Sequence, residues 1–275
     1  MTWHPGSVEH YLDRWRIDAV ERTLVTASSD LVFGARGEVP VVLKVPRVEE
    51  EARASAVLAW WAGEGAAPVL EHDEHAVLLL RATGGRDLAA WSRAGRDDEA
   101  TAVLVTTALR LHRAEPGGAP PDGLVPLSRW FDALLVDDST PPDAWRARAT
   151  EIARRLLAAT TAADEVVLHG DIHHGNVLDF GGGWAVIDPK GLRGHRAFDL
   201  ANIFCNPGPG AEHLVDRRLA LISEITGVER PLLAAWLVSW SALSVRWQER
   251  AGTRSWQGAA AQRVGERALA TANLL

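Results

Sequence analysis

In the first eighty residues, apolar side chains occur in short runs, and polar or glycine-containing turns separate these runs. Residues 24–45 carry three such runs, which predict three strands, and residues 68–72 and 76–81 predict two more. Between them, residues 49–61 consist of good helix formers and are followed by Gly63, so they predict a helix. The pattern therefore predicts a small sheet of about five strands with one helix.

Farther along the chain, the apolar positions follow a helical period. Residues 100–113 and 143–161 repeat apolar side chains three and four positions apart, and we expect residues 86–161 to be mainly helical. A length of 275 residues with 47% hydrophobic side chains allows one or two domains with a substantial core. Near the C-terminus, a stripe of large side chains with the same spacing predicts a helix face in that core: Trp236, Trp240, Leu243 and Trp247.

Residues 166–206 combine short apolar runs with side chains that can perform chemistry. The run Val166–Leu168 predicts a short buried strand, and the polar loop HGDIHHGN follows it directly. The apolar runs on either side of Gly181–Gly183 predict a β-hairpin, because glycine adopts a positive φ at little cost. Such a hairpin would bring Asp188 back beside Asn176.

Asp171, Asn176 and Asp188 suit the transfer of a phosphoryl group. The carboxylate of Asp171 can accept the proton of an attacking hydroxyl group, and the amide oxygen of Asn176 and the carboxylate of Asp188 can hold Mg²⁺. Magnesium prefers hard oxygen ligands and bridges the phosphates of a nucleotide such as ATP. We therefore predict Asp171 as the general base and Asn176 and Asp188 as metal ligands, against the alternative of a purely structural hairpin.

The order of these residues is similar to the protein-kinase pattern of a catalytic aspartate, an asparagine five residues later and a later metal aspartate. The details differ, because the loop begins His-Gly-Asp and Asp188 is followed by Pro189-Lys190. These features resemble the aminoglycoside phosphotransferase family. The run GWAVIDPKGLRG, from Gly183 to Gly194, narrows the resemblance to the streptomycin 6-phosphotransferase branch, also called the aminoglycoside/hydroxyurea resistance kinases. The resemblance covers nearly the whole chain.

The resemblance implies an α+β, two-lobed, protein-kinase-like fold, with a small N-terminal antiparallel sheet lobe that includes one helix and a larger, mainly helical C-terminal lobe. Residues 1–82 would form the nucleotide-binding lobe, and residues 83–275 would form the catalytic and acceptor-binding lobe. The backbone at Leu80 and Ala82 would meet the nucleotide base where the chain crosses between the lobes.

Ser28 and Ser29 lie in the predicted loop between the first two strands. Backbone amides and hydroxyl groups of such a loop can bond phosphate oxygens. The resembled family commonly closes this loop with serines, which implies contact with the nucleotide phosphates, and an ordinary hairpin loop is the alternative. The sequence contains neither a Gly-x-Gly-x-x-Gly nor a Walker A motif.

Lys44 ends a Val-Val-Leu run, so a period of two places a cation on an otherwise buried strand. Nucleotide phosphates or a helix glutamate would compensate this charge, and an edge-strand lysine in solvent is the alternative. The resemblance, counted back from the end of the predicted helix, selects Glu51 as the partner of Lys44. Glu49 and Glu50 would be solvated charges at the start of the helix, and Glu51 could be a third.

Histidines flank the predicted base. His169, His173 and His174 are spaced four and one apart without cysteines nearby, so they fit no ordinary zinc site. The resemblance implies instead that His169 and His174 position the catalytic loop. It implies a supporting role for Asp199 as well, with a structural aspartate on or under a helix as the alternative.

The resemblance places the acceptor pocket in the C-terminal lobe and implies phosphorylation of the 6-hydroxyl of streptomycin. A cationic aminoglycoside with guanidinium groups would need carboxylates and aromatic faces around it. Four acidic side chains are candidates only, and a solvated helix charge is the favoured alternative for each: Glu212, Asp216, Glu224 and Glu249. The alternative functions are a metabolic kinase for a sugar or amino sugar and a non-catalytic nucleotide-binding module.

The net charge of −7 argues against a large nucleic-acid-binding surface. The chain has one cysteine, Cys205, so it cannot form an internal disulfide. The sequence contains neither a long apolar run nor a signal-peptide core, so we expect a cytoplasmic protein without membrane contact. We also expect a monomer. A protein kinase is disfavoured, because the segment Pro189–Arg196 is too short for an activation segment and Ala-Pro-Glu is absent.

Overall fold

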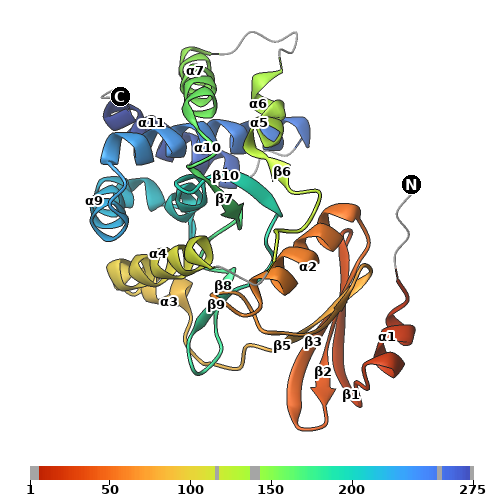
Figure 1. Ribbon diagram of the computed structural model, residues 1–275. Helices are drawn as coiled ribbons and strands as arrows, with labels where there is room; N and C mark the ends of the chain where they lie inside the picture. The colour runs from red at the N-terminus through yellow and green to blue at the C-terminus, as the bar shows by residue number, and fades with distance from the viewer. Residues whose placement is uncertain (1–5, 115–117, 137–142, 253–255, 273–275) are drawn as a thin grey trace.

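The protein consists of an N-terminal sheet and a larger helical part, as the computed structural model of residues 6–114, 118–136, 143–252 and 256–272 shows (Figure 1). The sheet has the order β1-β2-β3-β5-β4, and each neighbouring pair is antiparallel. The fold class and the five strands expected from the sequence are confirmed. The strands are β1 (Ala19–Val25), β2 (Ser29–Arg36), β3 (Val39–Pro46), β4 (Val69–Asp73) and β5 (Ala76–Leu80).

Alternating side chains of β3 separate the two faces of this sheet. Val41 and Leu43 are fully buried and pack in a cluster with Tyr11 of helix α1 (Val8–Arg14). Lys44 lies on the opposite face, toward helix α2 (Glu49–Trp61), which covers that side of the sheet (Figure 1). The period of two thus gives one face to the core and the other to the site.

The helical part is organised around α10, whose central residues are buried. Helices α7, α8 and α11 pack against it, and the aromatic rings of Phe131, Phe198 and Trp236 meet edge to face at its side. The expectation that the tryptophan stripe faces the core is confirmed, because Trp236, Trp240 and Leu243 are buried. The longer helices are α4 (Asp97–Arg113), α7 (Ala144–Ala159), α9 (Val215–Thr226), α10 (Arg230–Arg250) and α11 (Trp256–Ala272), and the shorter ones are α3 (Leu88–Arg93), α5 (Leu127–Trp130), α6 (Asp132–Leu135) and α8 (Phe198–Ala201).

Two small sheets lie beside these helices. The predicted strand after the helical region is present as β7 (Glu165–Leu168), and the predicted hairpin is formed by β8 (Val177–Asp179) and β9 (Trp184–Val186). Two strands were missed: β6 (Val125–Pro126) and β10 (Leu192–His195). Strand β10 lies between β6 and β7 and pairs with both. The two missed strands have two and four residues and carry no alternation, so they gave no periodic signal.

The β8–β9 hairpin forms backbone hydrogen bonds with the segment before β4 and with the segment after β5, where the chain crosses from the sheet to the helices. The backbone of Val186 exchanges hydrogen bonds with Gly65 and Ala67 at 2.9 Å, and Gly84 N–H donates to the carbonyl oxygen of Asp179 at 2.9 Å. A Cβ on Gly84 would lie 2.0 Å from the carboxyl carbon of Asp179, so this close approach requires glycine. These bonds hold the hairpin next to the N-terminal sheet.

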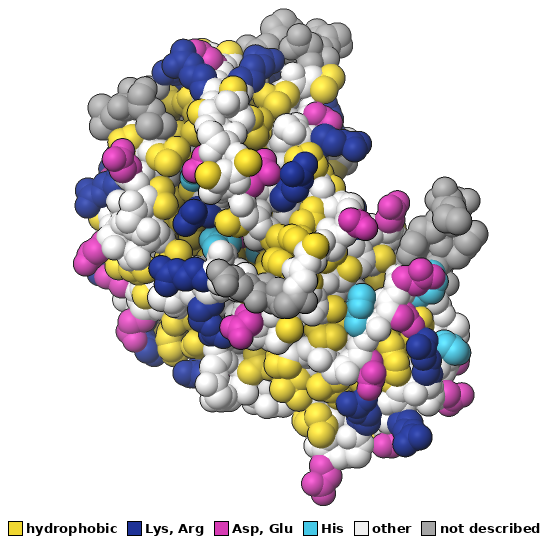
Figure 2. Space-filling view, viewed as in Figure 1, with side chains coloured by type: hydrophobic (Ala, Val, Ile, Leu, Met, Phe, Trp, Pro, Cys, Tyr) yellow, Lys and Arg dark blue, Asp and Glu magenta, His cyan; other side chains and the backbone are white. Residues whose placement is uncertain are grey.

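Charged side chains of both signs are interspersed over the face of the molecule in Figure 2. Dark blue and magenta side chains alternate there without a broad region of one sign, unlike the basic stripe of a nucleic-acid-binding face. In the described parts of the chain, every helix is too short or too polar to cross a membrane.

Candidate active site

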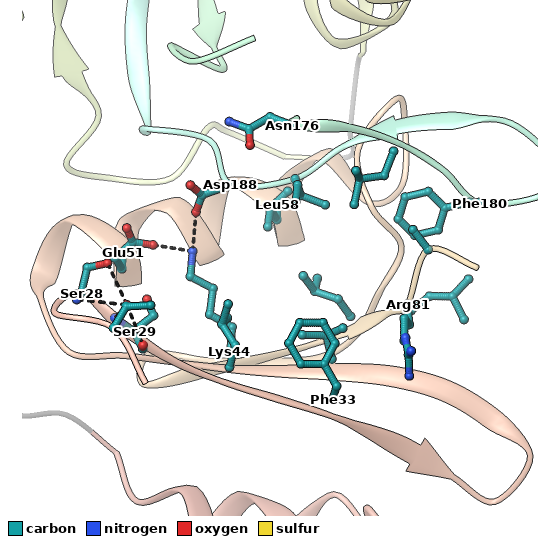
Figure 3. Close-up of a pocket in the computed structure, with 18 of the residues that line it drawn as sticks. Ser28, Ser29, Phe33, Lys44, Glu51, Leu58, Arg81, Asn176, Phe180 and Asp188 are labelled. Carbon is teal, nitrogen blue, oxygen red and sulfur yellow. Dashed lines mark hydrogen bonds and ion pairs between the residues drawn. The ribbon is translucent and has the colours of Figure 1, made fainter. Parts of the chain in front are cut away.

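A cavity of about 530 Å³ lies between the N-terminal sheet and the β8–β9 hairpin (Figure 3). Apolar side chains from both sides line most of it. Most of the polar side chains gather at one end, and Arg81 lies at the other end (Figure 3). The apolar lining includes Leu31, Val42, Leu79, Leu178, Phe180 and Ile187. The polar end consists of Ser28, Ser29, Lys44, Glu51, Asn176 and Asp188. An apolar slot with convergent polar groups at one end suits a planar base joined to a charged tail.

Lys44 lies at the centre of the polar end. Its ammonium group contacts the carboxylate of Glu51 and donates to Oδ1 of Asp188 at 2.7 Å (Figure 3). Lys44 is 6% exposed and Glu51 is 8% exposed, whereas Glu49 and Glu50 are exposed. The alternatives of a solvated Lys44 and a solvated Glu51 are therefore wrong, and β3 and α2 bring the two side chains together.

Asp188 follows the hairpin and has an unusual backbone. Its φ is +59°, a region that side chains other than glycine rarely adopt, and such positions concentrate at functional sites. Its second oxygen, Oδ2, accepts from Lys190 at 3.3 Å. Burial alone would raise the pKa of Asp188, but Lys44 and Lys190 outweigh burial and lower the pKa to about 2. The carboxylate is ionised at neutral pH and is available to a cation.

Asn176 is brought beside Asp188 by the hairpin, as the three glycines predicted. Ile187 N–H donates to the carbonyl oxygen of Asn176 at 2.9 Å, and the Asn176 side-chain amide donates to the carbonyl oxygen of Asp171 at 3.0 Å. Its amide oxygen is left on the side of Asp188 (Figure 3).

The Asn176 and Asp188 oxygens fit Mg²⁺. Hard oxygen donors suit this ion, which usually takes one or two protein ligands together with phosphate oxygens and waters. Within the described residues, His, Cys, Asp and Glu form no group of three that could hold a metal alone. The donor set therefore suits a metal that arrives with a nucleotide rather than a metal held by the protein alone.

Asp171 lies across from this pair, in the loop after β7. The side-chain amide of Asn202 donates to its Oδ1 at 2.5 Å, and Asn176 donates to its Oδ2 at 3.3 Å. Lys190 lies 3.8 Å and His173 lies 3.9 Å from the same Oδ2. The side chain is 29% exposed, so the carboxylate is oriented by amides and still open to a partner.

The backbone of the Asp171 loop is fixed by Asp199. The buried Asp199 carboxylate accepts from the backbone amides of His169 at 2.9 Å and Gly170 at 2.6 Å. It accepts a third bond from Nε2 of His112 at 2.8 Å. The alternative of an aspartate on the helix surface is wrong, because Asp199 is 1% exposed.

His169 joins the same loop to Ile187, the residue that follows β9. It is fully buried; Nε2–H donates to the carbonyl oxygen of Ile187 at 2.8 Å, and Nδ1 accepts from Asp171 N–H at 3.1 Å. Burial lowers its pKa, so the ring is neutral in the tautomer that these two bonds require. The ring stacks on Trp61 of α2.

His174 lies away from the base, near the buried ion pair of Asp97 and Arg218. Burial and then Arg218 lower its pKa to about 3. In the described structure neither of its ring nitrogens has a hydrogen-bond partner. His174 was predicted to position the catalytic loop, whereas His173 is the histidine that lies near Asp171, at 3.9 Å.

Ser28, Ser29, Leu80 and Ala82 all line the cavity. Ser28 is in the turn between β1 and β2, and Ser29 is the first residue of β2 rather than a loop residue. The Thr26 hydroxyl oxygen accepts from the backbone amides of both serines, at 3.3 and 2.9 Å, so these amides already have partners. Leu80 N–H likewise donates to the carbonyl oxygen of Pro68 at 2.9 Å.

Three side chains of the site were not assigned from the sequence: Asn202, Lys190 and His112. The first lies one turn after Asp199 in the segment Phe198–Cys205, and this spacing was the only local indication of its position. Lys190 was part of the family motif without a role. No local pattern indicated His112, which lies in α4, far along the chain from Asp199.

The acidic candidates for the acceptor pocket are mostly paired with arginines. Glu249 contacts Arg146 at 3.1 Å and also Arg246, while Glu224 is exposed. Two further pairs involve arginines of α11: Glu212 pairs with Arg263, and Asp216 pairs with Arg267.

Two solved structures share the fold along nearly the whole chain. A choline/ethanolamine kinase family protein from Mesorhizobium loti has a TM-score of 0.65 with 17% sequence identity, over 93% of this chain and 92% of that chain. Aminoglycoside phosphotransferase APH(4)-Ia, as a thermostable mutant in a ternary complex with AMP-PNP and hygromycin B, has a TM-score of 0.63 with 15% identity, over 98% of both chains.

Sequence relatives are considerably more similar. A streptomycin 3''-kinase from Klebsiella pneumoniae is 41% identical over 86% of this chain and 90% of its own length, and a streptomycin 6-kinase from Streptomyces glaucescens is 32% identical over 84% and 78%. A hydroxyurea phosphotransferase from Kitasatospora aureofaciens is 31% identical over 90% and 74%.

Residues 14–252 match the family described as aminoglycoside/hydroxyurea antibiotic resistance kinase. This match confirms the family resemblance that the motif between Gly183 and Gly194 indicated. The chain belongs to the aminoglycoside/hydroxyurea antibiotic resistance kinase family and is a small-molecule kinase.

Proposed function

We propose that this enzyme transfers the γ-phosphoryl group of ATP to a hydroxyl group of streptomycin and thereby inactivates the antibiotic. The observation that carries the choice of acceptor is the 41% identity with a streptomycin 3''-kinase along 90% of that protein. Two streptomycin 6-kinases, at 32% and 31% identity, support the same acceptor.

In this proposal, residues 1–82 bind the nucleotide and residues 83–275 supply the base and the acceptor pocket. Lys44 binds the α- and β-phosphates, and Glu51 holds Lys44 in place. Ser28 and Ser29 lie at the phosphate end of the cavity, and the backbone at Leu80 and Ala82 lies where the base would rest.

Asn176 and Asp188 would hold Mg²⁺ in this site. When bound, the ion supplies charge neutralisation for the phosphates. Asp188 is suited to this task because it is ionised at neutral pH.

Asp171 orients the acceptor hydroxyl and takes its proton. A bond forms between the acceptor oxygen and the γ-phosphorus, the bond from that phosphorus to the ADP oxygen breaks, and the acceptor proton moves to the Asp171 carboxylate. Asn202 holds one oxygen of this carboxylate at 2.5 Å, and Asp199 fixes the loop that carries it. Catalysis is then mainly positioning and electrostatic stabilisation.

The modified hydroxyl is the point on which the relatives differ. Phosphorylation of the 6-hydroxyl was expected from the family resemblance, and this stays a prediction. The higher identity and coverage with the 3''-kinase favour the 3''-hydroxyl, which belongs to a different ring of the antibiotic. Phosphorus and proton NMR of the purified product distinguishes the two positions.

The experiment that tests the acceptor is ATP consumption by the purified enzyme with Mg²⁺ over a panel of streptomycin, other aminoglycosides, hydroxyurea, glucosamine and simple sugars. Turnover with streptomycin above all other members is the expected result. Turnover only with a sugar would overturn the proposed acceptor and favour the metabolic kinase, an alternative that the fold shared with a choline/ethanolamine kinase family protein keeps relevant. Turnover only with hydroxyurea would point to the activity of the Kitasatospora relative.

A further inference from the structure

The chain contains only two lysines, Lys44 and Lys190, among its 29 basic lysine and arginine residues. Both contact the same side chain: Lys44 donates to Oδ1 of Asp188 at 2.7 Å, and Lys190 donates to Oδ2 at 3.3 Å. All other cationic side chains of this size are arginines. The two lysine ammonium groups thus meet at one carboxylate of the candidate active site, that of Asp188.

Lys190 lies between the predicted base and the predicted metal ligand. Its ammonium nitrogen is 3.3 Å from Asp188 and 3.8 Å from Oδ2 of Asp171, and the side chain is 21% exposed. Its backbone amide donates to the carbonyl oxygen of His169 at 2.6 Å, which fixes the start of the side chain against the catalytic loop. The cation therefore bridges two carboxylates that belong to different segments.

We propose that Lys190 binds the γ-phosphoryl group during transfer and is a catalytic residue in its own right. The inference rests on the proposed function, which places that group between the hydroxyl oriented by Asp171 and the nucleotide held at Asp188. Lys190 is the cation that lies between those two carboxylates. Its ammonium offsets the repulsion between the incoming phosphoryl oxygens and the Asp171 carboxylate, which at these short distances is substantial.

The chemistry of lysine fits this task better than that of arginine. An ammonium group is a compact charge with three donors on a flexible stem, so it can exchange a carboxylate for a phosphate oxygen. Arginine forms planar, bidentate pairs, and the bonds of Arg86 to both oxygens of Asp179 at 2.6 and 2.8 Å are of this kind. Lys190 makes single contacts at 3.3 and 3.8 Å, which leave donors for the phosphoryl group.

The first test compares two nucleotides in the Lys190→Met variant. Calorimetry with Mg²⁺ and either ADP or the non-hydrolysable AMP-PNP isolates the contribution of the γ-phosphoryl group. We expect affinity for AMP-PNP to fall about tenfold while affinity for ADP changes less than about twofold, because one charge-assisted contact is lost. Lys44→Met is the matched control, and it should weaken both nucleotides, since Lys44 binds the α- and β-phosphates in the proposed function.

Turnover gives the second measure. Lys190→Met should lower kcat about a hundredfold with little change in KM for the acceptor, and Lys190→Arg should recover part of the loss. Lys190→Gln replaces Lys190→Met if thermal melting shows that the methionine variant is unfolded. Equal losses of ADP and AMP-PNP affinity, or an unchanged kcat, would overturn the role of Lys190.

A spectroscopic measurement separates contact from a structural effect. Protein labelled with ¹³C at lysine Cε carries two side-chain signals, one for each lysine, and the Lys44→Met variant assigns them. AMP-PNP with Mg²⁺ should move the Lys190 signal beyond the shift that ADP causes, and an identical shift with both nucleotides contradicts the inference. If the wild-type enzyme binds neither nucleotide, the proposed function falls first and the inference falls with it.

Discussion

Arg218 and the two lysines form ion pairs of opposite kinds. Arg218 is 1% exposed; it donates to both oxygens of Asp97 at 3.0 and 2.6 Å and to the carbonyl oxygens of Ile203 and Asn206 at 2.6 Å. The lysine contacts surround a carboxylate that is 36% exposed, and each oxygen of Asp188 receives a single donor. A saturated pair in the interior fixes the fold, whereas an open, single-contact pair can give way to a ligand.

The largest effect on turnover should come from substitutions in the exposed ion-pair site that contains Asp171, Asp188 and the two lysines. Asp171→Ala removes the proposed general base, so turnover should fall on the order of 10³- to 10⁴-fold while the affinity for ADP stays within about twofold. Coupled assays of ATP consumption and calorimetry measure the two quantities. Wild-type turnover in this variant would rule out Asp171 as the base.

Asp188→Ala is the partner experiment. Here turnover should also be lost, but nucleotide binding should no longer respond to Mg²⁺, because the carboxylate that would hold the ion is gone. The two variants thus separate proton transfer from metal binding. An unaltered Mg²⁺ dependence of ADP affinity would contradict the ligand role of Asp188.

A second expectation concerns Cys205, which lies in the segment that Arg218 ties down. Burial raises the pKa of this thiol to about 12, so the thiolate fraction at pH 8 should be about a thousandfold below that of an ordinary cysteine. Alkylation by iodoacetamide, followed by mass spectrometry, should therefore be very slow in the folded protein and fast in denaturant. The chain has a single cysteine, so any alkylated cysteine found by mass spectrometry is Cys205. Rapid labelling at native conditions would show that the segment opens readily.

A third expectation addresses the saturated pair itself. Arg218→Met removes the cation that pairs with the buried Asp97 carboxylate and, among the described residues, leaves Asp97 with only the Ser92 hydroxyl as a donor, which should lower the free energy of unfolding by about 3–5 kcal/mol. Urea denaturation measures this change, and labelling of Cys205 should accelerate in parallel. The double variant with Asp97→Leu should recover part of the loss, since no unpaired charge remains. If the single variant loses less than about 1 kcal/mol, the pair does not fix the fold.

The smallest expected effect concerns a pair intermediate between these two kinds. Tyr11 donates to Asp73 at 2.8 Å, and the exposed Arg14 contacts the same carboxylate. Burial and then Asp73 raise the pKa of Tyr11 to about 12, above its ordinary value of 10.0. The bond therefore contributes stability at pH values below 10, and this contribution is lost as the pH rises from 10 to about 12.

Absorbance titration at the phenolate band measures this directly, because Tyr11 is the only tyrosine of the chain. The midpoint in the folded protein should lie near 12, and Asp73→Asn should lower it. A midpoint at the ordinary value in the wild type would show that the N-terminal cluster around Tyr11 is open in solution.

The sequence predicted which side chains meet at the polar end of the cavity because the signals there are local. Asn176 and Asp188 belong to one hairpin whose glycines are visible in the sequence, and Lys44 ends an apolar run. The pairing of Lys44 with Glu51 needed one more step, a count along the following helix, and the two side chains do meet.

The remainder depends on contacts between distant parts of the chain. Asn202 reaches Asp171 from a 3-10 helix 31 residues later, and Arg218 reaches Asp97 across 121 residues. The spacing between Asp199 and Asn202 indicated where Asn202 lies but not which side chain it contacts. The choice between His173 and His174 depends on the path of the loop backbone, since adjacent residues in a loop can face different neighbours. Two short strands, β6 and β10, were missed for a related reason, because pairing partners rather than alternation define them.

The scarcity of lysine also determines where the native protein can be cut. A protease that cleaves only after lysine has two sites in the whole chain: one in β3, between its neighbours β2 and β5, and one at Lys190, whose backbone amide is bonded to His169. Each of these peptide bonds follows a lysine of the candidate site, so we expect cleavage only when the segment that carries it opens. The yield of fragments 1–44, 45–190 and 191–275 therefore measures opening of this site rather than general fraying, and a bound nucleotide should slow their release.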